Sequence, residues 1–467
     1  MSGAALTETV ASVADAAPVP YWLDRSRRIP DHQPLSGGFD CDLLVVGGGF
    51  TGLWAAIEAS AHRRDVLVVD AGALATGASG RCGGFVNASI THGIVHGHAR
   101  WPGEMAAIVA IQQALWDDTM ALLDTHDRGV IEPSGKLTVA TRPHQLAELE
   151  EAVAILRRYD QDVALLDADA VRAELDSPTY LGGYRLANAN GVCDPVRLAE
   201  ALAAIATERG VRFAEHTKIE RLRDGGAAVT VHTATGAVGR ARQVVLATNA
   251  YPPLRRRLRS RVIPVYDHVI ATAPLTAEQW GSIGWHSRGG VTDAGNQFHY
   301  YRPTPTGGVL FGGWDATYHF GGRVDPGLER RPGTHRLLAR HLVETFPALE
   351  GIEITHAWGG PIDSTSRFTP TFGTAMGGKL GWAVGFTGLG VGSSRFAALA
   401  ALDLLAGAET ERTRLSMVRR APIPFPPEPL RWPVIQLTKR ALAAQDRTGR
   451  KGPWLRLLDR IGVGFDT

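Results

Sequence analysis

The hydrophobic positions of the chain follow two periods, one typical of buried strands and one typical of amphipathic helices. Near the start, an apolar run at residues 41–46 meets a glycine turn, and apolar residues then recur at helical spacing through 53–57. A second apolar run follows at 66–69. The order strand, helix, strand over so short a stretch predicts a β-α-β unit with parallel strands.

Further segments of both kinds follow along the chain. Helical spacing predicts helices at 104–126, 144–160, 195–210, 334–349 and 393–406. Strands are expected near 135–140, within 211–223 and 228–236, and at 242–251. Between 262 and 314 the strands are short, rich in aromatic residues and broken by Gly and Pro, which predicts an antiparallel sheet. The pattern therefore indicates a parallel α/β domain interrupted by an α+β domain.

Composition and charge narrow the function classes. The 467 residues include 44% hydrophobic and 21% charged ones, with a net charge of +2, too mild to indicate nucleic acid as a partner. The arginine run at 255–261 is expected to be a solvated crossover. Cys41, Cys82 and Cys193 are widely spaced and odd in number, which speaks against a disulfide framework or a metal site. The first residues lack a secretory signal and the apolar stretches are interrupted, so we expect a cytoplasmic protein without a membrane span.

The glycine turn after the first strand carries the first chemical signal. Gly47, Gly49 and Gly52 form G-x-G-x-x-G between a strand and a helix, and Asp70 ends the next strand. The first glycine permits the tight turn, the second lets a pyrophosphate approach the backbone, and the third allows close helix–strand packing. The acid stands at the usual distance for accepting hydrogen bonds from an adenosine ribose. This context predicts a dinucleotide site, with Phe50, Thr51 and Ala71 beside it.

The cofactor is expected to be FAD rather than a nicotinamide. A nicotinamide fold would continue with regular β-α repeats, whereas a helical excursion and an antiparallel region interrupt this chain. We expect a discontinuous Rossmann-like FAD-binding domain and a second, substrate domain built on an antiparallel sheet. The expected division is an N-terminal surface arm at 1–39, the FAD-binding domain at 40–99, 190–255 and 355–410, the substrate domain at 100–189 and 256–354, and a C-terminal docking tail at 411–467.

Several motifs occur together in the order typical of one family. They are the glycine turn with its acid, the loop GASGRCGGF at 77–85, the stretch 246–272, the strand pair 300–314 and the turn GFTGLGVGSS at 385–394. This set resembles the D-amino-acid-oxidase-like flavoenzymes over most of the chain, and within them the gamma-glutamylputrescine oxidase-like amine oxidoreductases. The match is specific for the fold and for FAD, and less specific for the substrate.

The resemblance implies which residues contact FAD. The loop at 77–85 would run along the flavin, because a flat ring pressed against main chain needs glycine. Residues 218–219 would meet the adenine, 247–249 would close over the cofactor, and 388–392 would face the flavin pyrimidine with helix N–H groups. The implied contacts are Gly77, Ala78, Ser79, Arg81, Cys82, Gly83, Gly84, Phe85, Lys218, Ile219, Ala247, Thr248, Asn249, Gly388, Leu389, Gly390, Val391 and Gly392.

Departures from the resemblance bear on the substrate. Glycine oxidases hold the substrate carboxylate with an arginine whose position matches Ile362, and sarcosine oxidases place a lysine near Gly392 instead. Neither charge is present, so an amine held mainly by aromatic contacts is expected over a simple α-amino acid. The lysine that helps oxygen react in sarcosine oxidases corresponds to Leu310, which leaves the electron acceptor open between oxygen and a carrier. Cys82 stands where some relatives attach flavin, yet a small buried cysteine is the commoner role.

Substrate contacts are expected on the antiparallel sheet that would roof the flavin. Because strands alternate their faces, only some of the candidates can point inward, and each also has a plain structural role as an alternative. The candidates are His268 and Tyr300 for catalysis, and Tyr301, Arg302, Trp314 and Trp358 for substrate binding. A desolvated pocket would itself lower the pKa of a bound amine, so no dedicated base is demanded.

The expected activity is FAD-dependent oxidation of an amine C–N bond to an imine, which water then hydrolyses. One alternative is a dehydrogenase of D-amino or N-alkyl amino acids that passes electrons to a carrier. Another is a flavin-fold module without catalysis, or one linked to tRNA. The C-terminal tail is expected to dock on the protein's own body or on a second subunit, so an oligomer through the tail is possible.

Overall fold

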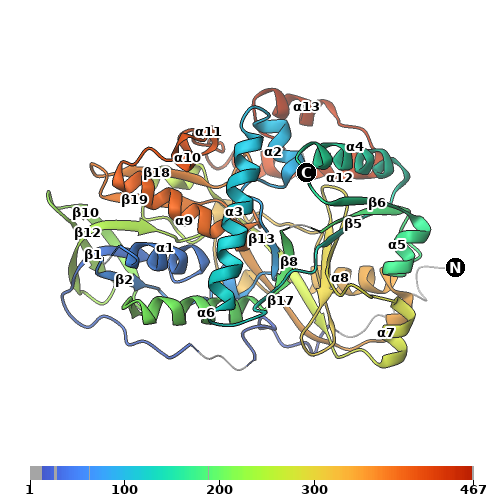
Figure 1. Ribbon diagram of the computed structural model, residues 1–467, viewed down its shortest axis with the longest axis horizontal. Helices are drawn as coiled ribbons and strands as arrows, with labels where there is room; N and C mark the ends of the chain where they lie inside the picture. The colour runs from blue at the N-terminus through green and yellow to red at the C-terminus, as the bar shows by residue number, and fades with distance from the viewer. Residues whose placement is uncertain (1–12, 26–28, 63, 188, 465–467) are drawn as a thin grey trace.

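The computed structural model describes residues 13–25, 29–62, 64–187 and 189–464. Within these residues the chain forms two large sheets and one small three-stranded sheet. In Figure 1 the first large sheet with α1 and α9 occupies one side, the second large sheet with α5, α7 and α8 the other, and the long α3 stands in front between them. The expected two-domain α/β architecture is confirmed.

The first sheet is parallel at its centre because β-α connections join its strands. Its parallel strands are β19 (Leu380–Val384), β12 (Val238–Leu246), β1 (Asp40–Val46), β2 (Val66–Val69) and β9 (Arg212–Ala214). Antiparallel strands complete it: β10 (Ile219–Asp224), β11 (Val229–Thr233) and β18 (Thr371–Ala375).

Helices cover one face of this sheet. They are α1 (Phe50–Ser60), α3 (Met105–Asp124), α6 (Pro195–Glu208) and α9 (Gly390–Ala406). Leu43 and Val45 of β1 pack in the core with these helices, whereas Leu44 lies in a second core on the opposite face. Both faces are therefore buried, which explains why β1 reads as a continuous apolar run.

The second sheet roofs the first domain. Its strands in order are β17 (Ile354–Ser364), β13 (Ile263–Thr272), β16 (Val309–Gly313), β15 (His299–Pro303), β14 (Gly290–Asp293), β5 (Lys136–Ala140), β7 (Gly182–Leu186) and β6 (Val163–Asp167). The pair β14–β5 is parallel, so the sheet is mixed where a purely antiparallel one was expected. α5 (Ala168–Glu174), α7 (Ala277–Ile283) and α8 (Pro332–Thr345) share a core with one face, and the other face turns inward.

The structure moves two of the expected domain boundaries. β17 pairs along its length with β13, so residues 355–364 belong to the second sheet and not to the FAD-binding domain. α3 packs through Leu123 into the core of the first domain, although its sequence lies within the expected 100–189 substrate segment. Both differences arise because long-range pairing decides membership, and pairing leaves no local signal in the sequence.

The remaining elements connect or cover the two domains. The small sheet contains β3 (Phe85–Asn87), β4 (Ile131–Glu132) and β8 (Asn190–Cys193). The remaining α-helices are α2 (Ile94–Arg100), α4 (Pro143–Arg158), α10 (Glu411–Arg414), α11 (Ser416–Arg419), α12 (Arg431–Thr448) and α13 (Pro453–Arg460). Within the described ranges, no helix is both long enough and apolar enough to cross a membrane.

The C-terminal tail packs on the protein's own body. Asp446 of α12 accepts hydrogen bonds from the backbone N–H groups of Asn296 and Gln297, at 2.9 and 2.8 Å. Leu455 and Leu458 of α13 are buried. The tail thus covers the β14–β15 end of the second domain, and a role in joining subunits stays a prediction.

The N-terminal arm is more than a surface strap where it is described. Tyr21 and Trp22 are buried in a core cluster with Leu310 and Trp358, and Ala17 forms a parallel bridge to His356. The Trp22 indole Nε1 donates a hydrogen bond to the Cys82 carbonyl oxygen at 2.8 Å. The arm therefore supports the loop at 77–85 from within the protein, although residues 1–12 and 26–28 of the expected arm lie outside the described residues.

Trp22→Ala should destabilise the fold by about 3–5 kcal/mol, because it removes a fully buried indole and leaves a cavity. Urea unfolding followed by fluorescence measures the change. Trp432→Ala is the matched control, since Trp432 on α12 is 41% exposed and its loss should cost less than about 0.5 kcal/mol. Equal effects of the two variants would contradict a supporting role for the arm.

Candidate active site

A continuous cavity of about 1820 Å³ lies between the two domains. It is lined by the residues that follow β1, β2 and β12, by the start of α9 and by the inward face of the second sheet. Ligands of open α/β sheets bind at these carboxyl ends of the strands. A pocket for one small molecule ordinarily holds roughly 300–1,000 Å³, so this cavity has room for a dinucleotide and a substrate.

The glycine turn forms the floor of one end of the cavity. Gly47 has a φ of 111°, and Gly47, Gly49, Phe50 and Thr51 line the cavity as expected. Gly52 is not among the lining residues. It packs against the turn so closely that a Cβ at this position would overlap the carbonyl oxygen of Gly47. Gly52 thus permits close packing of α1 against the turn, the role expected for the third glycine.

Asp70 is positioned as an acceptor at the end of β2. Its two carboxylate oxygens accept hydrogen bonds from the N–H groups of Gly48 and Gly72, at 2.7 and 2.8 Å. Burial raises the pKa of this carboxyl group. Asp70 and the adjacent Ala71 both line the cavity, where the carboxylate can accept hydrogen bonds from ribose hydroxyl groups.

The loop at 77–85 is held by its carbonyl groups. Beyond the Trp22 bond to Cys82, the Trp358 indole Nε1 donates to the Arg81 carbonyl oxygen at 3.0 Å. The Arg302 guanidinium donates to the carbonyl oxygen of Gly84 at 3.1 Å and to that of Cys193 at 2.6 Å. Three buried side chains thus fix the backbone of the loop from the side opposite the cavity.

The side chains of the loop also build it. The guanidinium of Arg81 pairs with Glu329 at 3.1 Å and donates to the Thr76 carbonyl oxygen, and the Ser79 hydroxyl accepts from the Phe50 N–H at 3.0 Å. The loop therefore offers backbone more than free polar groups to a cofactor. All the expected loop residues line the cavity: Gly77, Ala78, Ser79, Arg81, Cys82, Gly83, Gly84 and Phe85.

The other expected FAD contacts continue along the same cavity. Lys218, Ile219, Ala247, Thr248, Asn249, Gly388, Leu389, Gly390 and Val391 line it. Gly392 does not line the cavity. It packs against β3, where a Cβ would overlap the Asn87 carbonyl oxygen. The Oγ1 of Thr248 and the Oδ1 of Asn249 are buried without a hydrogen-bond partner in the described structure. This elongated part of the cavity, with its glycines, the Asp70 carboxylate and two polar atoms without a hydrogen-bond partner, fits FAD.

His268 faces away from the cavity. Asp267 and Val269 of β13 line the cavity, so the alternation of the strand turns His268 to the other face, where its ring lies 5.4 Å from that of His335. Burial lowers the pKa of His268 to about 3. The expectation of His268 as a catalytic group was one position out of phase, and Asp267 takes its place in the site.

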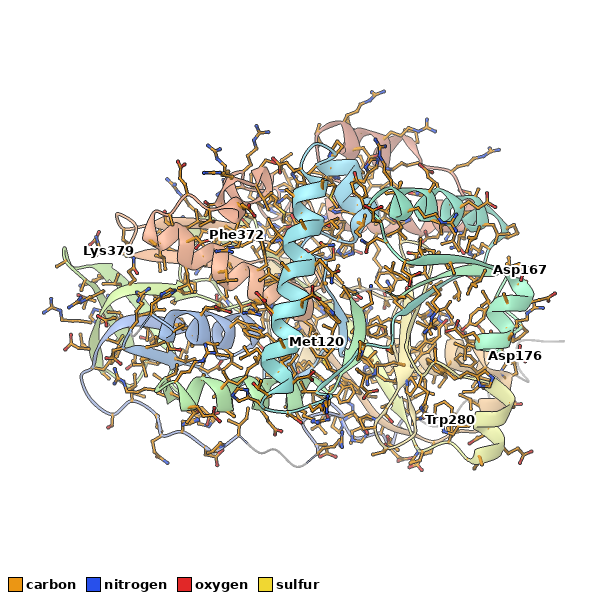
Figure 2. The ribbon with its side chains drawn as sticks, in the orientation of Figure 1. Met120, Asp167, Asp176, Trp280, Phe372 and Lys379 are labelled. Carbon is orange, nitrogen blue, oxygen red and sulfur yellow. The ribbon has the colours of Figure 1, made fainter. Side chains whose placement is uncertain are left out.

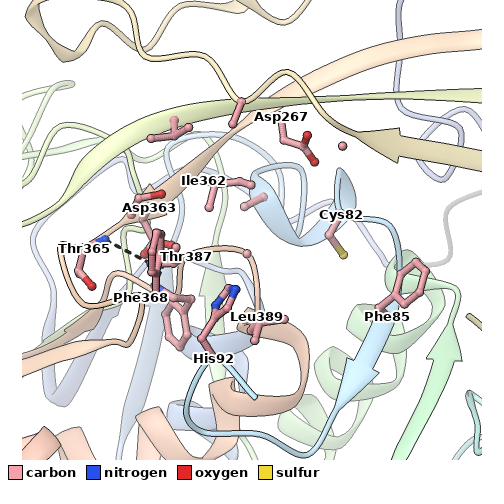
Figure 3. A pocket seen from close by; sticks show the side chains of 18 of the residues that line it. Cys82, Phe85, His92, Asp267, Ile362, Asp363, Thr365, Phe368, Thr387 and Leu389 are labelled. Atoms are coloured by element: carbon pink, nitrogen blue, oxygen red, sulfur yellow. Dashed lines mark hydrogen bonds between the residues drawn. The ribbon is translucent and has the colours of Figure 1, made fainter. Parts of the chain in front are cut away.

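Asp267 and Tyr300 form a hydrogen-bonded pair on the cavity wall. The Tyr300 hydroxyl donates to an Asp267 carboxylate oxygen at 2.6 Å, and both residues line the cavity. Burial raises the pKa of Asp267 to about 6, and the bond from Tyr300 opposes the rise. Figure 3 shows the Asp267 carboxylate on the cavity wall above Cys82.

Two glycines create the space for the Tyr300 ring. A Cβ on Gly83 of the loop would lie 2.7 Å from Tyr300 Cε2, and a Cβ on Gly312 of β16 would lie 2.6 Å from Tyr300 Cζ. The ring can therefore cross β16 and reach Asp267 on β13. Its position is set by the loop on one side and by the sheet on the other.

The expected substrate contacts divide between two locations. Trp314 lines the cavity and stacks on His299 with ring centroids 4.8 Å apart. Tyr301 points into the core of the second domain, where its hydroxyl bonds that of Tyr180 at 2.7 Å. Arg302 and Trp358 are buried beneath the loop at 77–85. The last three residues therefore support the site and do not line it.

Lys136 and His92 are among the cavity residues that the sequence did not predict. Lys136 at the start of β5 and His92 after β3 both line the cavity, and Figure 3 shows the His92 ring beside Phe368 and Leu389. Alternation in GKLTVA places Lys136 and Leu137 on opposite faces of the strand, and the sequence shows this alternation. It does not show which of the two faces borders the cavity, because the β14–β5 pairing decides it.

Four features together define a two-domain flavin-dependent oxidoreductase: the glycine turn, the acid after β2, the loop at 77–85 and the second sheet above the cavity. The chain belongs to the family of FAD-dependent oxidoreductases, whose pattern matches residues 42–404. FAD is accordingly its cofactor.

Three individual proteins illustrate what this chain is similar to. The gamma-glutamylputrescine oxidoreductase of Escherichia coli is 29% identical over 437 residues, covering 92% of this chain and 98% of that one. The glycine oxidase structure from Geobacillus kaustophilus has a TM-score of 0.65 at 22% identity and covers 80% of this chain and 96% of its own. The iminodiacetate oxidase from Chelativorans sp. has a TM-score of 0.64 at 17% identity, covering 81% and 98%. The two structures show the shared fold.

Acid denaturation should release free FAD from the protein. The Cys82 thiol donates to the Ser79 carbonyl oxygen at 3.4 Å, and burial raises its pKa to about 11, so the nucleophilic thiolate is scarce at neutral pH. The precipitated protein is expected to be colourless and the supernatant yellow, for Cys82→Ser as for the wild type. Flavin retained in the wild-type pellet but not in that of Cys82→Ser would show a covalent bond.

Proposed function

We propose that the protein oxidises the C–N bond of a primary or secondary amine to an imine, which water hydrolyses to a carbonyl compound. The FAD-dependent oxidoreductase family, with a curated relative named for an amine substrate, supports the reaction class. The observation that carries the proposal is the Asp267–Tyr300 pair, a carboxyl group on the wall of the cofactor cavity with a raised pKa and a fixed orientation.

Asp267 suits an amine substrate because amines arrive protonated. Alkyl ammonium groups have pKa values of roughly 10 in water, and the ionised Asp267 carboxylate attracts such a cation. An amine must be neutral to be oxidised, so its proton moves to an Asp267 oxygen while burial lowers the amine's own pKa. Bound FAD supplies a two-electron acceptor for the hydride that leaves the carbon next to nitrogen. Tyr300 keeps the carboxylate in place by donating to it.

The surroundings of Asp267 disfavour a carboxylate next to the reacting carbon. Ile362, which lines the cavity, is an apolar residue where an amino acid substrate would need a cation. The neighbouring carboxylate of Asp267 would repel an α-carboxylate at short range. These two features support an amine over the D-amino or N-alkyl amino acid alternative. The electron acceptor, oxygen or a carrier, follows from neither feature.

Anaerobic mixing of the yellow holoenzyme with a panel of amines should bleach the flavin absorbance. Primary and secondary alkyl amines are expected to reduce the flavin, and D- and L-α-amino acids to do so at least about tenfold more slowly because of the charge repulsion. Readmitting air then reports whether oxygen restores the colour. Bleaching by α-amino acids and by no amine would contradict the proposal.

Asp267→Asn should lower the rate of flavin reduction by about 10²–10⁴-fold, because the amide neither attracts the ammonium group nor accepts its proton. In the wild type, kcat/KM should fall as the pH drops through about 6, since Asp267 becomes protonated there. Stopped-flow reduction across pH 5–9 measures both. A pH profile of Asp267→Asn that retains this acidic limb would rule out Asp267 as its source.

Tyr300→Phe tests the positioning role of the phenol. Removing a hydrogen bond to the ionised carboxylate raises the Asp267 pKa, so the acidic limb should move upward by about one pH unit. Tyr301→Phe is the matched control, because its hydroxyl bonds Tyr180 in the core away from the cavity. An unshifted limb in Tyr300→Phe would remove Tyr300 from the proposed mechanism.

A further inference from the structure

Lys136 projects from the second sheet into the cavity. It is the first residue of β5, where Leu137 and Val139 pack into the domain core while Lys136 and Thr138 line the cavity. The surface that Lys136 exposes therefore faces the cavity interior. Removal from bulk water lowers the pKa of its ammonium group to about 8, which leaves it mostly charged at neutral pH.

The charge of Lys136 has no counter-ion in the part of the chain that the structure describes. No ion pair or hydrogen bond of its Nζ joins it to another described residue, and burial alone accounts for its lowered pKa. Two other cations of the cavity differ in this respect, because Arg81 pairs with Glu329 and Lys439 pairs with Asp315. A charge held inside a protein without a partner is costly, so a ligand that supplies the partner binds favourably.

His92 lies near Lys136 and also lacks a partner on one ring nitrogen. Its Nδ1 is buried without a hydrogen bond in the described structure. Burial and, secondly, the positive charge of Lys136 lower the His92 pKa to about 4, so the ring is neutral and can donate one N–H. A cation from β5 and a neutral donor from the segment after β3 thus line the same cavity, near enough for the charge of Lys136 to act on the His92 ring.

We propose that Lys136 and His92 form an anion subsite that binds a carboxylate at the far end of the amine substrate. This inference rests on the proposed amine oxidation and adds the substrate class: amines whose chain ends in a carboxylate. The subsite is separate from Asp267, which receives the amino group.

The sheet separates the two charges by too much for a simple amino acid. β13 with Asp267 and β5 with Lys136 are four strand positions apart in the order β13-β16-β15-β14-β5. At ~4.8 Å per strand this is on the order of 19 Å along the sheet, and curvature shortens the direct path. The amino and carboxylate groups of an α-amino acid share one carbon. Only a substrate with an extended chain between its ends can reach both residues.

Amines with and without a terminal carboxylate test the subsite. The holoenzyme is mixed with ω-amino carboxylates of six to twelve carbons and with alkyl amines of equal length, and kcat/KM is measured by flavin reduction. In the wild type we expect the carboxylate to raise kcat/KM by about 10–100-fold at the best length, as a charge-assisted contact provides. Lys136→Met should bring this ratio close to one while leaving kcat/KM for the alkyl amine within about threefold.

Two further variants guard against a general defect. Lys136→Arg retains the charge and should keep a preference of at least about fivefold. Lys379→Met is the matched control, since this lysine pairs with Asp224 and lies at the outer edge of the first domain (Figure 2). An unchanged ratio in Lys136→Met, or an equal loss in Lys379→Met, overturns the proposal.

Binding of hexanoate gives a readout that needs no turnover. It is titrated into the oxidised holoenzyme and followed by the change in flavin absorbance, and its Kd should rise at least about tenfold in Lys136→Met. If no amine reduces the flavin but hexanoate binding depends on Lys136, the anion subsite stands and amine oxidation falls. Equal Kd values, or an effect of Lys136→Met only on reoxidation by air, overturn the subsite.

Discussion

The site depends on the loop at 77–85 being held as a rigid backbone surface between the two domains. Trp22 from the arm, Trp358 from β17 and Arg302 from β15 each donate to a carbonyl oxygen of the loop. All three donors are buried, where such bonds are strong and a missing one is expensive. One short loop thus links the chain's first described segment, the second sheet and the cofactor cavity.

The two domains supply different parts of the chemistry. The first contributes glycine turns, the start of α9 and Asp70, which suit a large and flat anionic cofactor. The second contributes a polar sheet face with Asp267 at one strand and Lys136 four strands away. Opposite charges held apart on a fixed sheet can bind the two ends of an extended molecule. Neighbouring charges would pair with each other and bind neither end.

Much of the first domain followed from the sequence, because its signals are local. Gly47, Gly49 and Asp70 lie within one β-α-β unit, and the strand–turn–helix context identifies them. The roofing sheet was harder, since the face of a strand that meets the cavity depends on partners distant in sequence. His268 was expected where Asp267 stands, an error of one residue that reverses the face. Arg302 and Trp358 are polar or aromatic residues near the cofactor, yet they support the loop and do not line the cavity.

The ring of Tyr300 occupies the volume of two missing side chains, one at Gly83 and one at Gly312. The distance between loop and sheet is therefore set by the thickness of a single aromatic ring. A methyl group added at either glycine displaces the phenol from Asp267 without touching any charged atom. These two glycines carry no side chain, yet they act as spacers for the Tyr300 ring. A survey of variants that judges each position only by its own side chain would therefore underestimate both of them.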